Sequence, residues 1–197
     1  NAGDGQRLLA VLQDGACADA VLRPLRAQQL ATVVQDWLVR RMASCLALPT
    51  VADRLRAFAA FRILAAVHEG PCGIRRLNQL CEEVLRASGI IDPRQDVHYH
   101  GRPLLVTSND YQLGLFNGDI GMVQEDGQGD RSVWFAGETV ARSLAPSRLP
   151  GHETVFAMTV HKSQGSEFDD VLLVLPQEDS RALSRELLYT AVTRARR

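Results

Sequence analysis

A polar loop between two apolar segments holds the residues best suited to chemistry. It begins at His161 and continues through Gln164, Gly165 and Glu167, so an imidazole, an amide, a flexible backbone position and a carboxylate follow one another closely. Open α/β sheets place their ligand sites in loops of this kind, at the carboxyl ends of buried strands. We therefore interpret this loop as the functional centre of the chain.

A second group of candidates lies at the end of the chain, where Arg194, Arg196 and Arg197 follow a helical pattern. Guanidinium groups present planar donor forks that suit phosphate and carboxylate oxygens. The same arginines would also interact favourably with the negative end of a helix dipole, which explains them without any ligand. Taken alone, His161 and Glu167 likewise fit a solvated surface loop. The residue types by themselves therefore leave both interpretations open.

Two apolar segments must position the polar loop. Val155–Val160 is rich in β-branched residues and lacks polar alternation apart from Thr159. This pattern predicts a strand buried on both faces, of the kind found at the centre of a parallel sheet. Val171–Leu175 is predicted to be a second strand, and Ser184 is a candidate cap of a closing helix. The buried face of that helix is predicted to consist of Leu187, Leu188, Ala191 and Val192.

The first hundred residues are predicted to be mostly helical scaffold. Apolar residues recur at three- and four-residue steps from Leu30 to Leu46 and again from Ile74 to Leu85, which indicates two amphipathic helices. Thr50 is a candidate cap for a helix between them. The denser apolar segment Phe61–Val67 is compatible with a short strand or with a helix. None of these segments carries residues that point to chemistry.

The segment from about Gly101 to Pro150 changes in character to short strands and turns. Turn signals such as Asn-Gly-Asp and Asp-Gly separate brief apolar runs. So many short strands in one segment predict a small antiparallel barrel inserted into an α/β frame. The candidate strands are Leu104–Thr107, Ile120–Val123, Val133–Phe135 and Thr139–Ser143.

Composition and charge narrow the class of protein. The 197 residues, 46% of them apolar, are enough for a sizeable core, and the net charge of −1 gives no bulk attraction to nucleic acid. The four cysteines form no Cys-x-x-Cys pair, which favours a reduced, cytosolic setting. No signal peptide, membrane-spanning run or metal-ligand spacing is recognisable. Because the chain begins at Asn1 and stops among arginines, we expect it to be a piece of a longer protein.

Three segments together resemble superfamily 1 helicases. Val160–Asp169, reading V-H-K-S-Q-G-S-E-F-D, resembles motif V, and Tyr189–Arg196, reading Y-T-A-V-T-R-A-R, resembles motif VI. Asn109–Gly121, reading N-D-Y-Q-L-G-L-F-N-G-D-I-G, resembles the segment that leads into the small inserted barrel of the branch that moves 5′ to 3′. Their order and spacing are most similar to the RecD family, the alpha subunits of bacterial exodeoxyribonuclease V.

The resemblance implies an incomplete second RecA-like motor domain with an inserted SH3-like β-barrel. Its expected parts are a helical and α/β portion over residues 1–100, the barrel over residues 101–150, and the remainder with motifs V and VI over residues 151–197. The implied activity is ATP-dependent 5′-to-3′ DNA helicase action in a RecBCD (exodeoxyribonuclease V) complex, in double-strand break repair and recombination in the bacterial cytoplasm. The implied partners are single-stranded DNA and RecB-like and RecC-like subunits.

The resemblance also implies roles for individual residues near the nucleotide. Arg194 and Gln164 would be catalytic, and Arg194 would reach across the cleft between motor domains to the γ-phosphate of ATP. Gly165 and Glu167 would bind the nucleotide together with Arg194. Gly165 would do so through close approach of the backbone, and Glu167 through the sugar.

Three further residues would contact single-stranded DNA, namely Thr159, His161 and Asn117. Thr159 and His161 are two apart at the end of a strand, so we expect both side chains to project to the same, DNA-facing side. Lys162 and Ser163 receive no role.

The departures from the family pattern matter as well. A phosphate-cradling G-x-x-x-x-G-K-[ST] loop is absent, and Lys162 is the only lysine. The metal-binding acidic motif of a first motor domain is not found either, so the chain would supply half of a site for ATP and Mg²⁺. Two other interpretations stay open: a stand-alone RecD-like helicase, and a catalytically silent interaction domain. The intact Gln164, Gly165, Glu167 and Arg194 argue against the silent domain.

Overall fold

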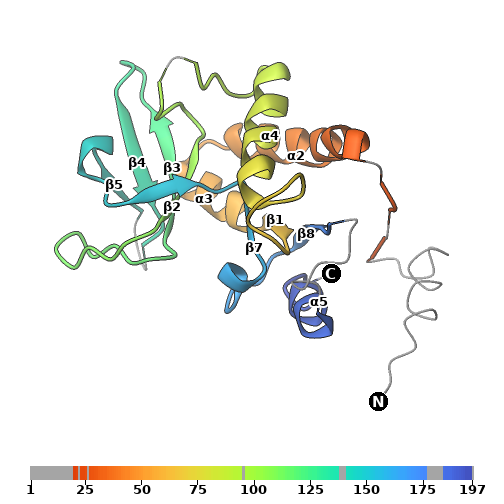
Figure 1. The fold of residues 1–197 in the computed structure, drawn as a ribbon. Helices are drawn as coiled ribbons and strands as arrows, with labels where there is room; N and C mark the ends of the chain where they lie inside the picture. The colour runs from red at the N-terminus through yellow and green to blue at the C-terminus, as the bar shows by residue number, and fades with distance from the viewer. Residues whose placement is uncertain are drawn as a thin grey trace.

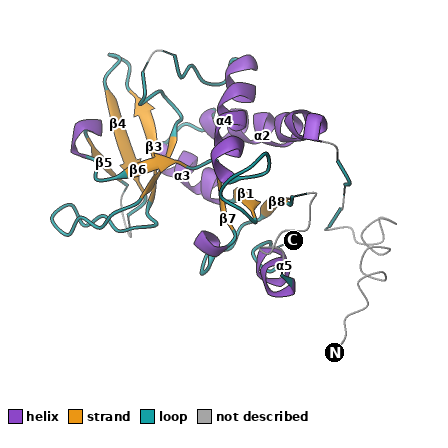
Figure 2. Ribbon diagram, viewed as in Figure 1, coloured by secondary structure: helices purple, strands orange, loops and turns teal. Residues whose placement is uncertain are grey.

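The computed structural model describes residues 20–196 except for residues 22, 26, 95, 138–140 and 177–183. Two sheets organise this part of the chain, one parallel with three strands and one antiparallel with five (Figure 1). Helices surround the parallel sheet, whereas strands, loops and a short helical turn make up the other side of the molecule (Figure 2). The elements in chain order are η1 (Ala27–Gln29), α2 (Leu30–Leu46), α3 (Val51–Ala59), β1 (Phe61–Ala65), α4 (Ile74–Ala87), β2 (Pro103–Val106), β3 (Ile120–Glu125), β4 (Arg131–Phe135), β5 (Arg142–Leu144), η2 (Pro146–Arg148), β6 (His152–Thr154), β7 (Ala157–Thr159), η3 (His161–Ser163), β8 (Asp170–Val174) and α5 (Arg185–Val192).

The parallel sheet has the strand order β7-β1-β8. Phe61–Ala65 is therefore a strand, and all its residues are buried. The prediction that Val155–Val160 forms a central strand is wrong in two respects. Its regular part, β7, covers only three residues, and β7 lies at one edge of the described sheet while β1 lies at the centre. β7 is nevertheless buried along its length, because helix α4 packs against it.

A side chain from α4 covers the free edge of β7. The Nδ2 of Asn78 donates to the carbonyl oxygen of Ala157 at 3.0 Å, and its Oδ1 accepts from the backbone N–H of the same residue at 2.9 Å. The amide thus takes the place of a neighbouring strand and satisfies two backbone groups that an edge strand leaves unpaired. An edge strand covered in this way is as apolar as a central strand, which explains why the sequence pattern misleads.

The predicted helices are confirmed. Thr50 caps α3, because its Oγ1 accepts a hydrogen bond from the backbone N–H of Asp53 at 3.1 Å. Helices α2 and α4 pack against each other and against the parallel sheet. No helix in the described ranges is long and apolar enough to cross a membrane. The residues at the centre of this core include Val34, Leu38, Met42, Ile63, Leu77, Cys81 and Leu85.

The antiparallel sheet has the strand order β5-β4-β3-β2-β6. The four strands predicted between Gly101 and Pro150 all occur, but the fourth begins at Arg142, and the predicted part over residues 139–140 lies outside the described residues. β6 joins this sheet by pairing with β2. The expected closed barrel is not observed. In the described part of the chain the sheet is open, with β5 and β6 as its two edges and no pairing between them.

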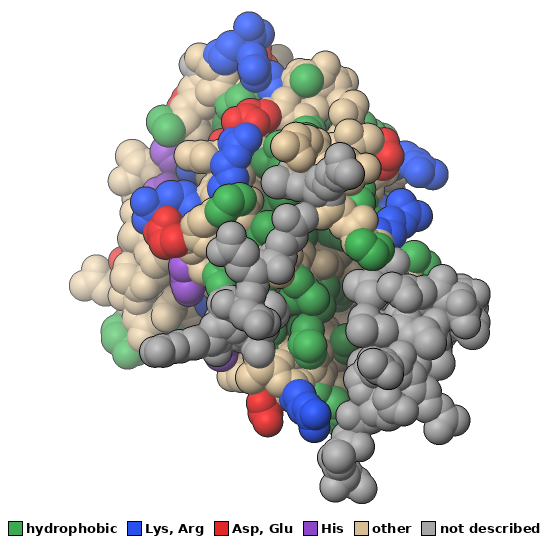
Figure 3. Space-filling model, turned by 45° about the vertical axis from the view of Figure 1, so that its right-hand side comes forward, with side chains coloured by type: hydrophobic (Ala, Val, Ile, Leu, Met, Phe, Trp, Pro, Cys, Tyr) green, Lys and Arg blue, Asp and Glu red, His purple; other side chains and the backbone are tan. Residues whose placement is uncertain are grey.

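A groove of about 1220 Å³ runs between α2 and β8, on the side away from the antiparallel sheet. Apolar side chains such as Trp37, Val39 and Leu172 line it. Figure 3, in which the right-hand side of Figure 1 comes forward, shows hydrophobic side chains gathered on this side. No residue of the polar loop lines the groove, so the candidate site lies elsewhere.

Candidate functional site

β7 ends at Thr159, and the chain turns at once into η3. Val160 has helical backbone angles (φ −53°, ψ −38°), which end the strand before His161. The Oγ1 of Thr159 accepts a hydrogen bond from the backbone N–H of Lys162 at 3.2 Å, and the hydroxyl of Ser163 donates to the carbonyl of Val160 at 2.7 Å. Both Thr159 and Ser163 are buried, so these hydroxyls hold the turn together from the inside.

Thr159 and His161 do not project to the same side. Thr159 is only 1% exposed, whereas His161 lies on the surface. Residues two apart share a side only within a continuous strand, and the helical conformation of Val160 interrupts the strand between them. The prediction of a shared outward face is therefore wrong, and His161 alone is accessible to a ligand.

The polar loop reverses direction at Gly165. Its φ of +83° lies in the left-handed region that side chains rarely adopt. A Cβ there would meet no atom within 4 Å, so the backbone conformation and not crowding requires glycine. The neighbouring Gln164, Ser166 and Glu167 are all exposed. The loop thus presents open backbone and polar side chains to any ligand that approaches.

Helix α5 begins after Ser184, whose Oγ accepts a hydrogen bond from the backbone N–H of Leu187 at 3.1 Å. Leu187 and Ala191 are buried and Leu188 is half-buried, as predicted. Val192 is 64% exposed, so its predicted burial is wrong. At about 100° per residue, Val192 lies roughly 140° around the helix from Leu187 and therefore outside the narrow buried face.

Hydrogen bonds join the end of α5 to the end of the polar loop. The N–H of Phe168 donates to the carbonyl of Arg194, and the N–H of Arg196 donates to the carbonyl of Phe168, each at 2.8 Å. Phe168 and Ala195 thereby form a parallel bridge. The guanidinium of Arg194 also donates to the carbonyl of Ser166 at 3.1 Å. Residues 28 positions apart in sequence are brought side by side in this way.

The two arginines of this segment have different surroundings. Arg194 donates from Nε to the carbonyl of Thr190 at 3.2 Å and from Nη2 to the hydroxyl of Thr193 at 3.4 Å. Arg196 pairs with the carboxylate of Glu167 at 3.2 Å. Within the described residues Arg194 has no carboxylate partner, so its charge is not neutralised locally. It can exchange its neutral partners for the oxygens of an anionic ligand, which bind a guanidinium more strongly.

An ion pair links the turn after β7 to the antiparallel sheet. The Nζ of Lys162 lies 2.7 Å from a carboxylate oxygen of Glu153 on β6. Both groups are partly exposed, so the pair is only a weak stabilising contact. The ion pair helps to position η3, because it connects η3 to a strand of the antiparallel sheet.

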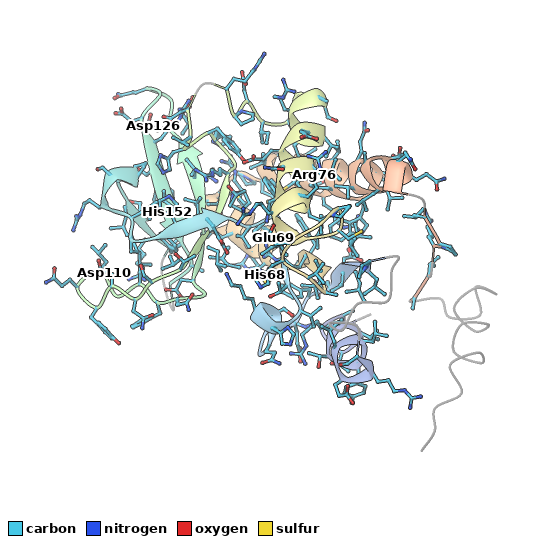
Figure 4. All side chains as sticks on the ribbon, viewed as in Figure 1. His68, Glu69, Arg76, Asp110, Asp126 and His152 are labelled. Carbon is cyan, nitrogen blue, oxygen red and sulfur yellow. The ribbon has the colours of Figure 1, made fainter. Side chains whose placement is uncertain are left out.

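Asn117 lies in the loop between β2 and β3, apart from the polar loop. This loop extends to the lower left in Figure 1, and Asp110 marks its position in Figure 4. The backbone N–H of Asn117 donates to the Oδ1 of Asn109 at 2.8 Å, and the Asn117 side chain is exposed. The structure therefore brings Glu167 and Arg194 together but leaves Asn117 at a separate place.

The assembled site can bind an anion through one side chain and hydroxyl groups through another. It combines a guanidinium without a carboxylate partner in the described part of the chain, exposed carboxylate oxygens on Glu167 and the open backbone at Gly165. A guanidinium suits phosphate oxygens, and a carboxylate accepts hydrogen bonds from sugar hydroxyls. The described residues contain no cluster of three or more histidine, cysteine or acidic side chains that could hold a metal ion.

Sequence reasoning missed one residue next to this site. Arg62 on β1 is 1% exposed, and its Nη1 donates to the carbonyl of Val155 at 2.9 Å. A signal was available, because Arg62 is the one charged residue inside the apolar segment Phe61–Val67. The apolar residues around Arg62 indicate only a strand or a helix, and the cost of burying a guanidinium is what marks this position as unusual.

The chain is similar in sequence to several known proteins. Residues 154–197, which include the polar loop and Arg194, match the UvrD-like helicase C-terminal domain. The chain is 42% identical to the RecBCD enzyme subunit RecD of Mycobacterium tuberculosis over 198 residues, which cover 100% of this chain and 34% of that protein. It is 39% identical to the RecBCD enzyme subunit RecD of Haemophilus influenzae over 141 residues, covering 71% of this chain and 21% of the relative.

One further sequence relative and one solved structure have helicase names. The chain is 35% identical to the ATP-dependent RecD2 DNA helicase of Deinococcus radiodurans over 138 residues, covering 70% of this chain and 19% of that protein. A crystal structure of Bacteroides Pif1 bound to single-stranded DNA superposes on 81% of this chain and 46% of its own, at 15% identity and a TM-score of 0.40.

The helicase domain match falls on the last two strands and the closing helix of the parallel sheet. The α/β frame around β7-β1-β8 thus has a RecA-like fold. The chain spans about a third of the length of the RecD proteins that it matches from end to end, at their C-terminal part. Because that match extends over its whole length at 42% identity, the chain belongs to the RecD family of helicase subunits.

Proposed function

We propose that this chain is the C-terminal motor portion of an ATP-dependent 5′-to-3′ DNA helicase that acts in a RecBCD (exodeoxyribonuclease V) complex. The observation that carries the proposal is that hydrogen bonds connect the polar loop to the end of α5. The guanidinium of Arg194 lies 3.1 Å from the carbonyl of Ser166, and the bridge between Phe168 and Ala195 holds the two segments in register. An arginine without a carboxylate partner among the described residues therefore lies beside a glycine-containing loop at one end of a parallel sheet.

We assign the nucleotide-facing role to Gly165, Glu167 and Arg194, with Gln164 as a second catalytic candidate beside them. Gly165 allows the nucleotide to approach the backbone, and Glu167 accepts hydrogen bonds from the sugar. The fork of Arg194 suits the charge that develops on a transferring phosphoryl group. When bound, ATP with Mg²⁺ supplies the phosphoryl transfer that drives the motor. Because this chain has no phosphate-cradling loop, most of that site belongs to the remainder of the longer protein.

We assign the DNA-facing role to His161 and, at a separate place, to Asn117. Both side chains are exposed, and both can hydrogen-bond to phosphate oxygens of a single strand. Thr159 acts behind His161, because its buried hydroxyl holds the turn that presents the imidazole. The pair between Lys162 and Glu153 connects this turn to the sheet next to it.

The wider organisation follows from the same proposal. Residues 1–100 and 151–197 form the motor domain, and the open five-stranded sheet in and around residues 101–150 corresponds to an SH3-like insertion. The partners are single-stranded DNA and RecB-like and RecC-like subunits, in the bacterial cytoplasm, in double-strand break repair. The likeness to the RecD2 DNA helicase favours a second candidate, a RecD-like helicase that acts without partner subunits.

The isolated chain is expected to hydrolyse ATP far below a helicase rate. Arg194 can only complete a site whose phosphate-binding loop and metal ligands are supplied elsewhere. The measurement is phosphate release by the purified chain with and without single-stranded DNA. DNA-stimulated hydrolysis that disappears in the Arg194→Ala variant of the isolated chain would contradict the proposal of a half-site.

The proposed function is tested by strand displacement with the full-length protein. The substrates are two duplexes that differ only in whether the single-stranded tail is 5′ or 3′. We expect ATP-dependent displacement from the 5′-tailed duplex and little from the 3′-tailed one once the protein is assembled with its partner subunits. Displacement that needs the partner subunits separates the RecBCD proposal from the stand-alone one. A full-length protein that neither hydrolyses ATP on DNA nor displaces a strand would overturn both.

A further inference from the structure

Arg62 is a buried cation with few partners. It is 1% exposed, and the bond from its Nη1 to the carbonyl of Val155 measures 2.9 Å. Its Nε is buried without a hydrogen-bond partner, and no carboxylate lies within ion-pair distance, as far as the described residues extend. Burial lowers the pKa of Arg62 to about 9, which still leaves the side chain charged near neutral pH.

Core packing alone does not account for an arginine at this place. A charge that is taken out of water and only partly hydrogen-bonded is unfavourable, and apolar residues of similar size often replace buried charges without loss of stability. The neighbours of Arg62 along β1 are apolar and buried. The reason for an arginine at this position therefore lies in the segments that its contacts hold in place.

Arg62 contacts three separate segments of the chain. Its guanidinium carbon lies 4.3 Å from the ring centroid of Phe58 on α3 and 5.5 Å from that of Phe168 at the end of the polar loop. Its hydrogen bond reaches Val155, between the last strand of the antiparallel sheet and the first part of β7. Aromatic faces attract a guanidinium, and more strongly when water is excluded.

Phe168 is the residue through which Arg62 reaches the candidate site. Phe168 is 4% exposed, and its backbone N–H and carbonyl are bonded to Arg194 and Arg196. Any shift of the Phe168 ring in the core would therefore shift the backbone that carries Arg194. Interiors are packed closely enough to transmit such a shift.

We propose that Arg62 is a positioning residue, which holds Phe168 against the core and thereby sets Arg194 relative to the polar loop. The placement of Phe168 and Arg194 is a property of the fold and does not depend on any activity. The consequence for catalysis rests on the proposed function. The two parts are tested by different measurements.

Hydrogen exchange in the full-length protein tests the placement. Peptides that span residues 166–170 and 193–196 report on the two amides of the bridge at Phe168. In Arg62→Met both peptides are expected to exchange at least tenfold faster, while α4 exchanges as in the wild type, and Arg62→Lys is expected to restore part of the protection. The control Val34→Ala truncates a buried side chain of α2 and is expected to raise exchange throughout the core without preference for these peptides.

Two results would overturn the placement. One is unchanged exchange of both peptides in a folded Arg62→Met variant. The other is a uniform increase like that of Val34→Ala, because it would mean that Arg62 only contributes to global stability.

ATP hydrolysis by the full-length protein tests the consequence. Small misplacements of a catalytic group cost on the order of ten- to a hundredfold in rate, so Arg62→Met is expected to lower kcat to that extent with little change in KM for ATP. Phe168→Leu is expected to produce the same loss, and the double variant is expected to be no worse than either single one, because the two residues act in series. An unchanged kcat in Arg62→Met, or additive losses, would overturn the role in catalysis. A wild-type protein without DNA-dependent hydrolysis would instead refute the proposed function, and the exchange measurement would still decide the placement.

Discussion

At the level of single residues, the surroundings of an arginine decide what it can do. Arg196 pairs with Glu167 and Asp169, all of them well exposed, and such surface pairs contribute about 0–1 kcal/mol. Arg194 bonds only neutral carbonyl and hydroxyl groups of the described chain. The same residue type therefore serves as a surface contact in one case and as a candidate ligand for an anion two positions earlier.

Thr159 and His161 are expected to respond differently to substitution. Thr159→Val leaves the backbone N–H of Lys162 without its acceptor in a partly buried turn, so the free energy of unfolding should fall by about 1 kcal/mol in urea titrations. His161→Ala removes an exposed side chain and should change stability by less than about 0.5 kcal/mol. In the full-length protein, His161→Ala should nevertheless weaken binding of single-stranded DNA of any sequence. Wild-type DNA affinity in that variant, measured by fluorescence anisotropy, would refute the role of His161.

The residue types identified the polar loop and Arg194 as candidates, but not their contact. The two segments are far apart in sequence, and only the bridge at Phe168 shows that they meet. The projection of Thr159 could not be predicted, because strand alternation holds only until the backbone leaves the extended region, here at Val160. The partners of Arg62 come from three segments, so its role can be recognised only in the folded structure and not from the sequence.

At the level of elements, the edge of β7 depends on one amide. Asn78→Ala leaves the N–H and carbonyl of Ala157 unpaired between α4 and β7, and the free energy of unfolding should fall by about 1–3 kcal/mol. Gln79→Ala, an exposed position on the same helix, is the matched control and should change stability by less than about 0.5 kcal/mol. Urea titrations of the two variants decide the matter. Equal stabilities would show that Asn78 does not cover the edge.

The segment that leads from α4 to β2 makes stability depend on pH. Burial, followed by the charge of Arg102, lowers the pKa of His98, and burial, followed by the charge of Arg54, lowers the pKa of His100. The Nδ1 of His100 also accepts the N–H of Glu125 at 3.1 Å, which requires the neutral ring. As the pH falls below the ordinary histidine pKa of about 6.5, the unfolded chain binds protons before the folded protein does. The contribution of these two histidines to the free energy of unfolding should therefore be fully present above that pH. It should be lost as the pH falls below it.

Urea titrations at pH 7.5 and pH 5.5 measure this decline. His100→Gln keeps an acceptor for the backbone N–H of Glu125 but cannot be protonated in this range, so its stability should depend less on pH. The same loss of stability between the two pH values in wild type and variant would assign the pH dependence to other groups.

Sequence patterns predicted the helices better than the sheets. The three- and four-residue spacing in α2 and α4 reports directly on burial, and both helices lie where the spacing places them. Strand patterns report burial but not neighbours, so the apolar segment around β7 has the pattern of a central strand although α4 covers its edge. The division of Val155–Val160 and the preceding residues between two sheets was equally hidden, because β6 and β7 are adjacent in sequence and belong to different sheets.

At the level of the whole molecule, the chain combines a RecA-like frame with an open antiparallel sheet, and it covers about a third of its RecD relatives. The family resemblance of three short segments was sufficient to predict this membership from the sequence. It was not sufficient to predict that the antiparallel sheet is open in the described residues, because closure depends on the pairing of β5 with β6 and no local pattern encodes that pairing.

Under the proposed function, this chain contributes Arg194 to a nucleotide site completed by the rest of the protein. Single-turnover ATP hydrolysis by the full-length protein on single-stranded DNA tests it most directly. In Arg194→Ala the rate should fall by about 10³- to 10⁵-fold while nucleotide binding falls much less, and Arg194→Lys should recover little because lysine lacks the planar fork. Arg185→Ala, an exposed position at the start of α5, should remain near the wild type. A near-normal rate in Arg194→Ala would contradict the claim and assign this arginine to packing at the end of the helix.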